Sequence, residues 1–257
     1  MDDTVSTARS IATLVRESEL SFLAGSIAFF AFFSLVPSLL LLVALGSLVG
    51  GEQFVTRIVR LFETSLSAGG GAVIGEALAD PTGQVGASIV GVVGLFWSAL
   101  KVFRAIDLAF DRIYTTDKST SLPQQLRDAT VVVVSIGGGI ILLLIVQITL
   151  VRLDTGFAPY SSLLGVPVLL VGLLIVLAPL YYVMPPVRLS VRQVVPGTIT
   201  AVVGLIALQQ VFHVYASFAG QYRAYGFIGA VLLFLLWLYV GALVLLLGAV
   251  VNVAVAR

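Results

Sequence analysis

Six long apolar stretches, separated by short clusters of charged residues, dominate the hydropathy pattern of this chain. The clearest is the 33-residue run from Ala224 to Ala256, which contains no Asp, Glu, Lys, Arg or His. As a helix with a rise of ~1.5 Å per residue, this run would measure about 50 Å, more than the ~30 Å hydrocarbon core of a bilayer. Charge-poor windows predict six transmembrane spans, at 23–48, 85–106, 130–151, 162–184, 194–218 and 225–254. All six should be α-helices, because a strand with an unpaired edge leaves its backbone groups unsatisfied in lipid.

The residues before the first span show a different periodicity. Within 1–22, Ile11, Leu14, Val15 and Phe22 recur at helical spacing, and charged residues lie between them. This pattern predicts an amphipathic helix that lies on the inner membrane interface.

The loop after the first span, residues 49–84, is the longest and is not plainly hydrophilic. Apolar residues recur with a helical period from Phe54 to Leu66, Gly69-Gly70-Gly71 interrupts the pattern, and Asp80-Pro81 ends a second short run. We interpret the segment as an external helical hairpin on, or dipping into, the outer leaflet. A surface loop that carries two helices fits the same pattern.

Composition extends the membrane prediction to the whole chain. Hydrophobic residues make up 59% of the sequence and charged residues 11%, whereas soluble domains carry roughly a quarter charged residues. We therefore predict one all-α, polytopic membrane domain over residues 1–257. The net charge of +1 and the scattered basic residues do not favour a nucleic-acid partner. The absence of cysteine excludes disulfides and thiolate metal sites.

Basic residues are unevenly divided between the two sides of the predicted membrane. One side collects ten Lys and Arg residues and the other four. The ten are Arg9, Arg16, Lys101, Arg104, Arg112, Lys118, Arg127, Arg188, Arg192 and Arg257; the four are Arg57, Arg60, Arg152 and Arg223. The positive-inside rule predicts a cytoplasmic-membrane protein with both termini in the cytoplasm. Since no apolar run precedes Ala24, we expect the first span to be retained as an anchor.

Four segments stand out by their order and spacing. The first span carries the run from Ala24 to Pro37, the second carries Trp97-Ser98 with Arg104, and the fifth opens on Val195-Pro196-Gly197. The sixth span carries Tyr225-Gly226-Phe227-Ile228-Gly229-Ala230, Leu236-Trp237-Leu238-Tyr239 and Leu247-Gly248-Ala249. Together these segments resemble the YihY/BrkB family of prokaryotic inner-membrane proteins over nearly the whole chain.

The resemblance implies six helices and a place in the cytoplasmic membrane. Members of the family have carried the label ribonuclease BN, and others a virulence or serum-resistance label, but neither label defines a mechanism. A Glu commonly follows the Leu-Gly-Ala motif of the last span in that family, whereas Val250 stands there in this chain. A role of that Glu in the family is therefore not assigned to this chain.

The richest polar feature lies at the end of the second span. Trp97, Lys101 and Arg104 share one helical stripe, with Asp107 beside it. The functional interpretation is a cationic lining that attracts an anionic solute or lipid headgroup into an inward-facing cavity. The alternative is a helix that leaves the bilayer, with both cations reaching for the headgroups and Arg104 pairing with Asp107.

Two further groups lie inside spans. Gln209, Gln210 and His213 belong to the fifth span, and their polar side chains should face the bundle, where they either contact substrate or join helices. Ser34 and Pro37 lie in the first span, where Pro37 should bend the helix, as in ligand-lining helices and in many ordinary bundles.

These residues support two hypotheses about function. The first is a protein that transports or flips an anionic or amphipathic solute or a lipid through a cavity between spans one, two and five. The second is a non-transporting scaffold or assembly factor that acts through its external hairpin.

We expect no enzyme, ribonuclease included, and no metal or cofactor. Metal-dependent RNA hydrolysis needs a cluster of His, Asp or Glu ligands. The chain has a single histidine, and the intraspan carboxylates are confined to Asp107 and Asp111.

Overall fold

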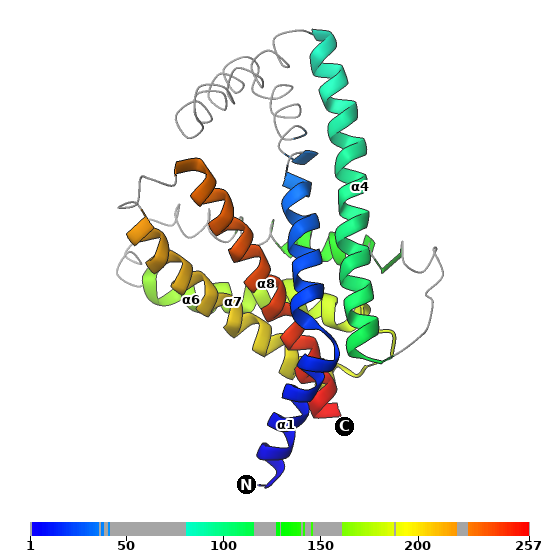
Figure 1. Ribbon diagram of the computed structural model, residues 1–257, viewed down its shortest axis with the longest axis vertical. Coiled ribbons are helices and arrows are strands. Elements are labelled where there is room, and N and C mark those ends of the chain that lie inside the picture. Colours follow the sequence, from blue (N-terminus) through cyan, green and yellow to red (C-terminus); the bar gives the residue numbers. More distant parts are fainter. Residues whose placement is uncertain are drawn as a thin grey trace. The chain divides into compact units, whose positions relative to one another are not determined.

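A computed structural model shows the helices that the chain forms (Figure 1). It describes residues 2–35, 37–38, 41, 81–115, 127–128, 130–139, 141, 145, 161–187, 189–219 and 226–256. Over these residues the chain is helical and contains no strand, which confirms the predicted all-α class for this part of the sequence.

Five labelled helices and two unlabelled ones form the described structure. The labelled helices are α1 (Asp2–Glu17), α4 (Pro81–Ile113), α6 (Ser161–Val183), α7 (Val191–Ala219) and α8 (Gly226–Ala256). Helix Leu20–Leu35 follows α1 directly, and a short apolar helix covers Thr130–Gly139. Each predicted span therefore overlaps a helix.

Two stretches are long and apolar enough to cross a membrane, Val191–Tyr215 in α7 and Val231–Val255 in α8. A bent pair, Ser10–Glu17 with Leu20–Leu35, passes the same test when its halves are taken together. This finding concerns the described residues alone, so the six-span topology stays a prediction. The external hairpin lies outside the described residues except for 81–84.

Residues 81–84 correct one predicted boundary. We assigned them to the hairpin, but they form the first turn of α4, which begins at Pro81. Proline is favoured at the first helical position, because its missing N–H would have no partner there and its φ suits a helix. The 33-residue helix also continues past the predicted span end at 106 and carries Asp107 on its last turns.

The predicted interfacial helix is shorter than 1–22. It ends at Glu17, because Ser18 and Glu19 form a turn with Glu19 at a φ of 50°. The two helices that flank this turn differ in direction by 57°. Arg112 donates to Glu19 across 3.0 Å and connects the turn with the end of α4. Because both side chains of this ion pair are largely exposed, it contributes little to stability.

The residues form two compact units. The first comprises Met1–Ala24, Ile106–Phe212 and Val240–Arg257, and the second Gly25–Ala105 and His213–Tyr239. We describe the packing within each unit separately.

The core of the first unit is formed by α6, α7, α8 and the end of α4, where Phe110 packs on Tyr181. The fully buried side chains include Phe110, Tyr181, Val202, Leu246 and Val250. Gly197 of α7 and Gly248 of α8 face each other: a Cβ added at either would meet the carbonyl oxygen of the other. The two glycines therefore allow the backbones of α7 and α8 to touch.

Candidate functional site

In the second unit, the first predicted span packs against α4 through its proline. A Cβ added at Gly94 would lie 3.1 Å from Cγ and 3.3 Å from Cβ of Pro37, so the proline ring rests on the glycine. This contact lies one turn before Trp97 on α4. The structure thus brings together Pro37 and the start of the predicted cationic stripe.

The hydroxyl groups beside Pro37 turn back onto their own helix. Ser34 Oγ donates to the Ala31 carbonyl at 2.7 Å, and Ser38 Oγ donates to the Ser34 carbonyl at 2.7 Å. Such bonds are typical of Ser in apolar helices and accompany bending. The Ser34 hydroxyl group therefore forms its hydrogen bond within its own helix in this structure.

Lys101 stacks on the indole of Trp97. Its Nζ lies 5.2 Å from the ring centroid, within the range of a cation–π interaction. Trp97 is 65% exposed, and Arg104, two turns further on, is exposed as well. Asp107 and Lys101 are half-buried.

This pair ends a continuous apolar stripe on the exposed face of α4. The large side chains of the stripe recur at intervals of three and four residues, and each is more than half exposed: Ile89, Val92, Val93, Phe96 and Trp97. The face therefore changes along the helix axis from purely apolar to cationic. An anionic amphiphile is complementary to this face, because it has apolar chains at one end and a negatively charged headgroup at the other.

The polar residues of α7 lie differently from our expectation. We predicted that Gln209, Gln210 and His213 face the bundle, but all three side chains are exposed. The buried face of α7 is instead formed by small and apolar residues, such as Ala201 and Val202.

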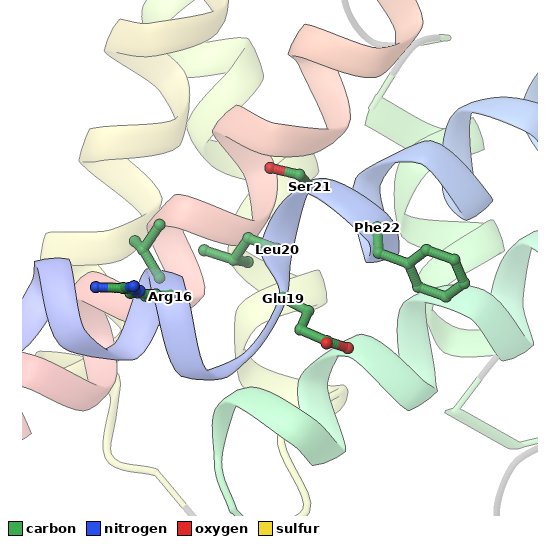
Figure 2. Close-up of a pocket in the computed structure, with 6 residues that line it drawn as sticks. Arg16, Glu19, Leu20, Ser21 and Phe22 are labelled. Atoms are coloured by element: carbon green, nitrogen blue, oxygen red, sulfur yellow. The ribbon is translucent and has the colours of Figure 1, made fainter.

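A surface hollow of about 680 Å³ opens at the bend between α1 and helix Leu20–Leu35 (Figure 2). Its lining comes from one continuous segment: Val15, Arg16, Glu19, Leu20, Ser21 and Phe22. Figure 2 shows Arg16 and Glu19 extending away from each other, so their charges are not gathered around one point. Residues that we predicted for a substrate cavity do not line this hollow.

A buried polar cluster at the α7–α8 contact was missed by sequence reasoning. Asn252, 1% exposed, accepts a hydrogen bond from the Gly197 amide through its Oδ1 at 2.6 Å. Tyr181 donates to the Leu245 carbonyl at 2.6 Å. The signal was present, since Asn252 is the one asparagine of the chain and stands in a 33-residue run without charged residues.

The phenol of Tyr114, just after α4, borders this cluster. Burial raises the pKa of Tyr114 to about 12, and the neighbouring Asn252 carboxamide opposes the rise in part. The folded protein therefore keeps the phenol neutral between pH 10 and 12, where an unfolded chain ionises it. The resulting stability is fully present below pH 10 and is lost as the pH rises through 12.

We predict that ionisation of Tyr114 lowers the free energy of unfolding of the parent by about 1 to 2 kcal/mol between pH 10 and 12. Tyr114→Phe has no phenol hydroxyl at this position, so this part of the loss should be absent. The measurement is thermal unfolding in detergent at several pH values across this range. Tyr182→Phe, at an exposed position, is the matched control for the loss of a phenol hydroxyl. Parallel curves for the parent and Tyr114→Phe would contradict the prediction.

The long apolar helices and the apolar side chains exposed along them define an integral membrane protein of the all-α class. The chain belongs to the Virulence factor BrkB family, whose sequence pattern matches residues 11–257. This match confirms the resemblance to the YihY/BrkB family.

Three curated relatives are similar to this chain. A putative ribonuclease-like protein, YfkH of Bacillus subtilis, is 27% identical over 175 residues, 63% of each chain. A UPF0761 membrane protein of Aromatoleum aromaticum is 27% identical over 243 residues, 89% of this chain and 58% of the relative. Another, of Pseudoalteromonas translucida, is 26% identical over 253 residues, 93% of this chain and 82% of the relative.

This chain thus spans about three fifths of the length of the first two relatives. No solved structure matches it. The described part of the chain brings no three His, Asp or Glu side chains together as metal ligands. The absence of ribonuclease activity stays a prediction.

Proposed function

We propose that this protein moves an anionic amphiphile, a phospholipid being the simplest case, between the leaflets of the cytoplasmic membrane. The observation that carries the proposal is the exposed stripe of α4. Its apolar part, from Ile89 to Phe96, matches acyl chains, and its end at Lys101 and Arg104 matches a phosphate headgroup.

The stacking of Lys101 on Trp97 supports this function. The contact holds the ammonium group at one place above an exposed ring, so less side-chain entropy is lost when an anion binds. Arg104 adds a planar donor group, which suits phosphate oxygens. Together the two cations supply attraction at the predicted cytoplasmic end of the path.

The packing of Pro37 on Gly94 provides the second element of the mechanism. A proline near the middle of a span weakens the helix at that point, and bent or broken helices line the sites of many transporters. Because this contact lies one turn from Trp97, a change in the bend would act directly beside the headgroup site. Transport therefore involves Pro37, Trp97, Lys101 and Arg104.

Flipping is tested in unilamellar phosphatidylcholine vesicles that contain the purified protein and a trace of fluorescent phosphatidylglycerol. Dithionite bleaches the outer leaflet, so a flipping protein makes the inner pool reactive as well. We expect Arg104→Gln to slow flipping about fivefold, because each basic side chain near a headgroup is worth about 1 kcal/mol. The double variant Lys101→Gln/Arg104→Gln should lose about thirtyfold.

The matched control is Arg192→Gln, an exposed arginine of α7 on the same predicted side. It should flip lipid like the parent. Equal rates for the parent and protein-free vesicles would overturn the proposed function. Equal rates for parent and Arg104→Gln, with an active parent, would show that the cations merely anchor the helix at the membrane surface.

A further inference from the structure

The buried side chain of Asn252 uses only one end of its carboxamide. Its exposed fraction is 1%, and its Oδ1 accepts a hydrogen bond from the Gly197 N–H at 2.6 Å. Because a backbone N–H can only donate, this contact fixes which end of the carboxamide is the oxygen. The Nδ2 group at the other end is buried and forms no hydrogen bond with the residues that the structure describes.

A buried N–H donor without an acceptor is unfavourable. In the unfolded chain it bonds to water, and that bond is lost on burial unless another acceptor replaces it. Most buried polar side-chain atoms are therefore paired, either with a protein group or with an ordered water molecule. Since bulk solvent does not reach Asn252, the acceptor for its Nδ2 group has to lie inside the protein.

Two phenol groups lie close to this donor in the first unit. Tyr114 is a neighbour of the Asn252 carboxamide, and its hydroxyl oxygen is buried. The rings of Tyr114 and Tyr181 both contact Phe110, with centroid distances of 6.2 Å and 6.0 Å. The end of α4 and helix α6 thus bring both phenols to the same side chain.

Tyr181 reaches the same face of α8 as Asn252. Its hydroxyl lies where a Cβ of Gly248 would be, and Gly248 precedes Asn252 by one helical turn. The hydroxyl donates to the Leu245 carbonyl at 2.6 Å, so the lone pairs of its oxygen can still accept. The face therefore combines a donor from Asn252 with an acceptor from Tyr181.

We propose that Asn252, Tyr114 and Tyr181 enclose one ordered water molecule. The Nδ2 group donates to the water oxygen, and the water donates its two protons to the two phenol oxygens. Three hydrogen bonds are the usual number for a buried water molecule. A bridging water joins neighbouring polar groups that form no direct bond, as Asn252 and Tyr114 do here.

The chemistry of the three side chains favours water over an ion. All three are neutral at neutral pH. The Nδ2 group presents only protons, so it would repel a cation. An anion would be buried without a countercharge, which is strongly unfavourable in an apolar interior. The water molecule thereby links the end of α4 to the contact between α7 and α8.

The single asparagine allows the water to be detected by NMR. Protein labelled only with 15N-asparagine, in perdeuterated detergent micelles, gives one pair of carboxamide protons. Asn252→Leu should lack this pair, which confirms the assignment. Magnetisation transfer from the water resonance then reports a water molecule bound beside Nδ2. We expect a cross-peak between water and the carboxamide protons, and its absence in the parent would overturn the proposal.

Tyr114→Phe distinguishes a bound water from a direct bond to the phenol. An exchanging Tyr114 hydroxyl proton would relay the same transfer if Nδ2 bonded to it directly. In the variant the water keeps Asn252 and Tyr181 as two partners, so the cross-peak should be retained. Loss of the cross-peak, with the carboxamide shifts unchanged, would assign the acceptor to Tyr114 and overturn the proposal.

An experimental structure of the parent, at a resolution that shows ordered waters, tests the site without any substitution. We expect one density peak at about 3 Å from Nδ2 and from both phenol oxygens. Absence of such a peak would overturn the proposal. The same holds for a peak that gains the anomalous signal of bromide when bromide replaces chloride, since this would identify an anion. None of these measurements depends on lipid flipping.

Discussion

Gly197→Ala is expected to lower the free energy of unfolding by about 3 kcal/mol, the result of a backbone contact that has no room for a methyl group. A Cβ at this position would collide with the Gly248 carbonyl oxygen and with the Asn252 carboxamide. The Gly248 oxygen belongs to the backbone and the Asn252 carboxamide to a buried side chain, so neither group can easily move away. Relief of the collision would separate α7 from α8 and break the hydrogen bond from the Gly197 amide to Asn252.

The measurement is denaturant unfolding of the purified protein in detergent, followed by circular dichroism. Gly25→Ala is the matched control, because a Cβ there meets nothing within 4 Å. Alanine favours a helix over glycine by about 1 kcal/mol, so this control should be as stable as the parent or slightly more stable. A Gly197→Ala protein that unfolds with the parent would show that the two helices do not touch here.

Asn252→Leu is expected to cost about 2 to 3 kcal/mol, although leucine is apolar and similar in size. The change removes the acceptor of the Gly197 N–H and leaves that donor buried without a partner, which costs about 1 to 3 kcal/mol. Pro196 directly precedes Gly197, lacks an N–H and crowds the preceding turn of α7. The local helix therefore cannot easily supply another acceptor for the Gly197 N–H.

Tyr181→Phe provides the comparison within the same cluster. It removes a hydroxyl whose acceptor, the Leu245 carbonyl, lies inside α8, where helical pairing is retained. The expected loss is about 1 kcal/mol. Asn252→Leu and Gly197→Ala should be non-additive in the double variant, because both break the same hydrogen bond. Full additivity, or an unaltered Asn252→Leu protein, would contradict the proposed arrangement.

The candidate site was partly predictable from local pattern. The stripe of Trp97, Lys101 and Arg104 follows from helical periodicity, and the structure adds that Lys101 stacks on Trp97. The packing of Pro37 on Gly94 is a contact between distant residues, and no periodicity reports which glycine receives a proline ring. Gln209, Gln210 and His213 were predictable as unusual residues, whereas the exposure of their side chains was not.

By itself, the sequence determined that this is an all-α membrane protein, since the need to pair backbone groups in lipid turns long charge-free runs into helices. It also determined the family and the cationic end of α4. The tertiary structure decided the turn at Glu19 and the face that α7 buries. It also decided that Asn252 meets Gly197, 55 residues away. Hydropathy reports how much a residue prefers lipid to water, whereas helix contacts in a membrane depend on shape and hydrogen bonding between distant residues, which a one-dimensional pattern does not contain.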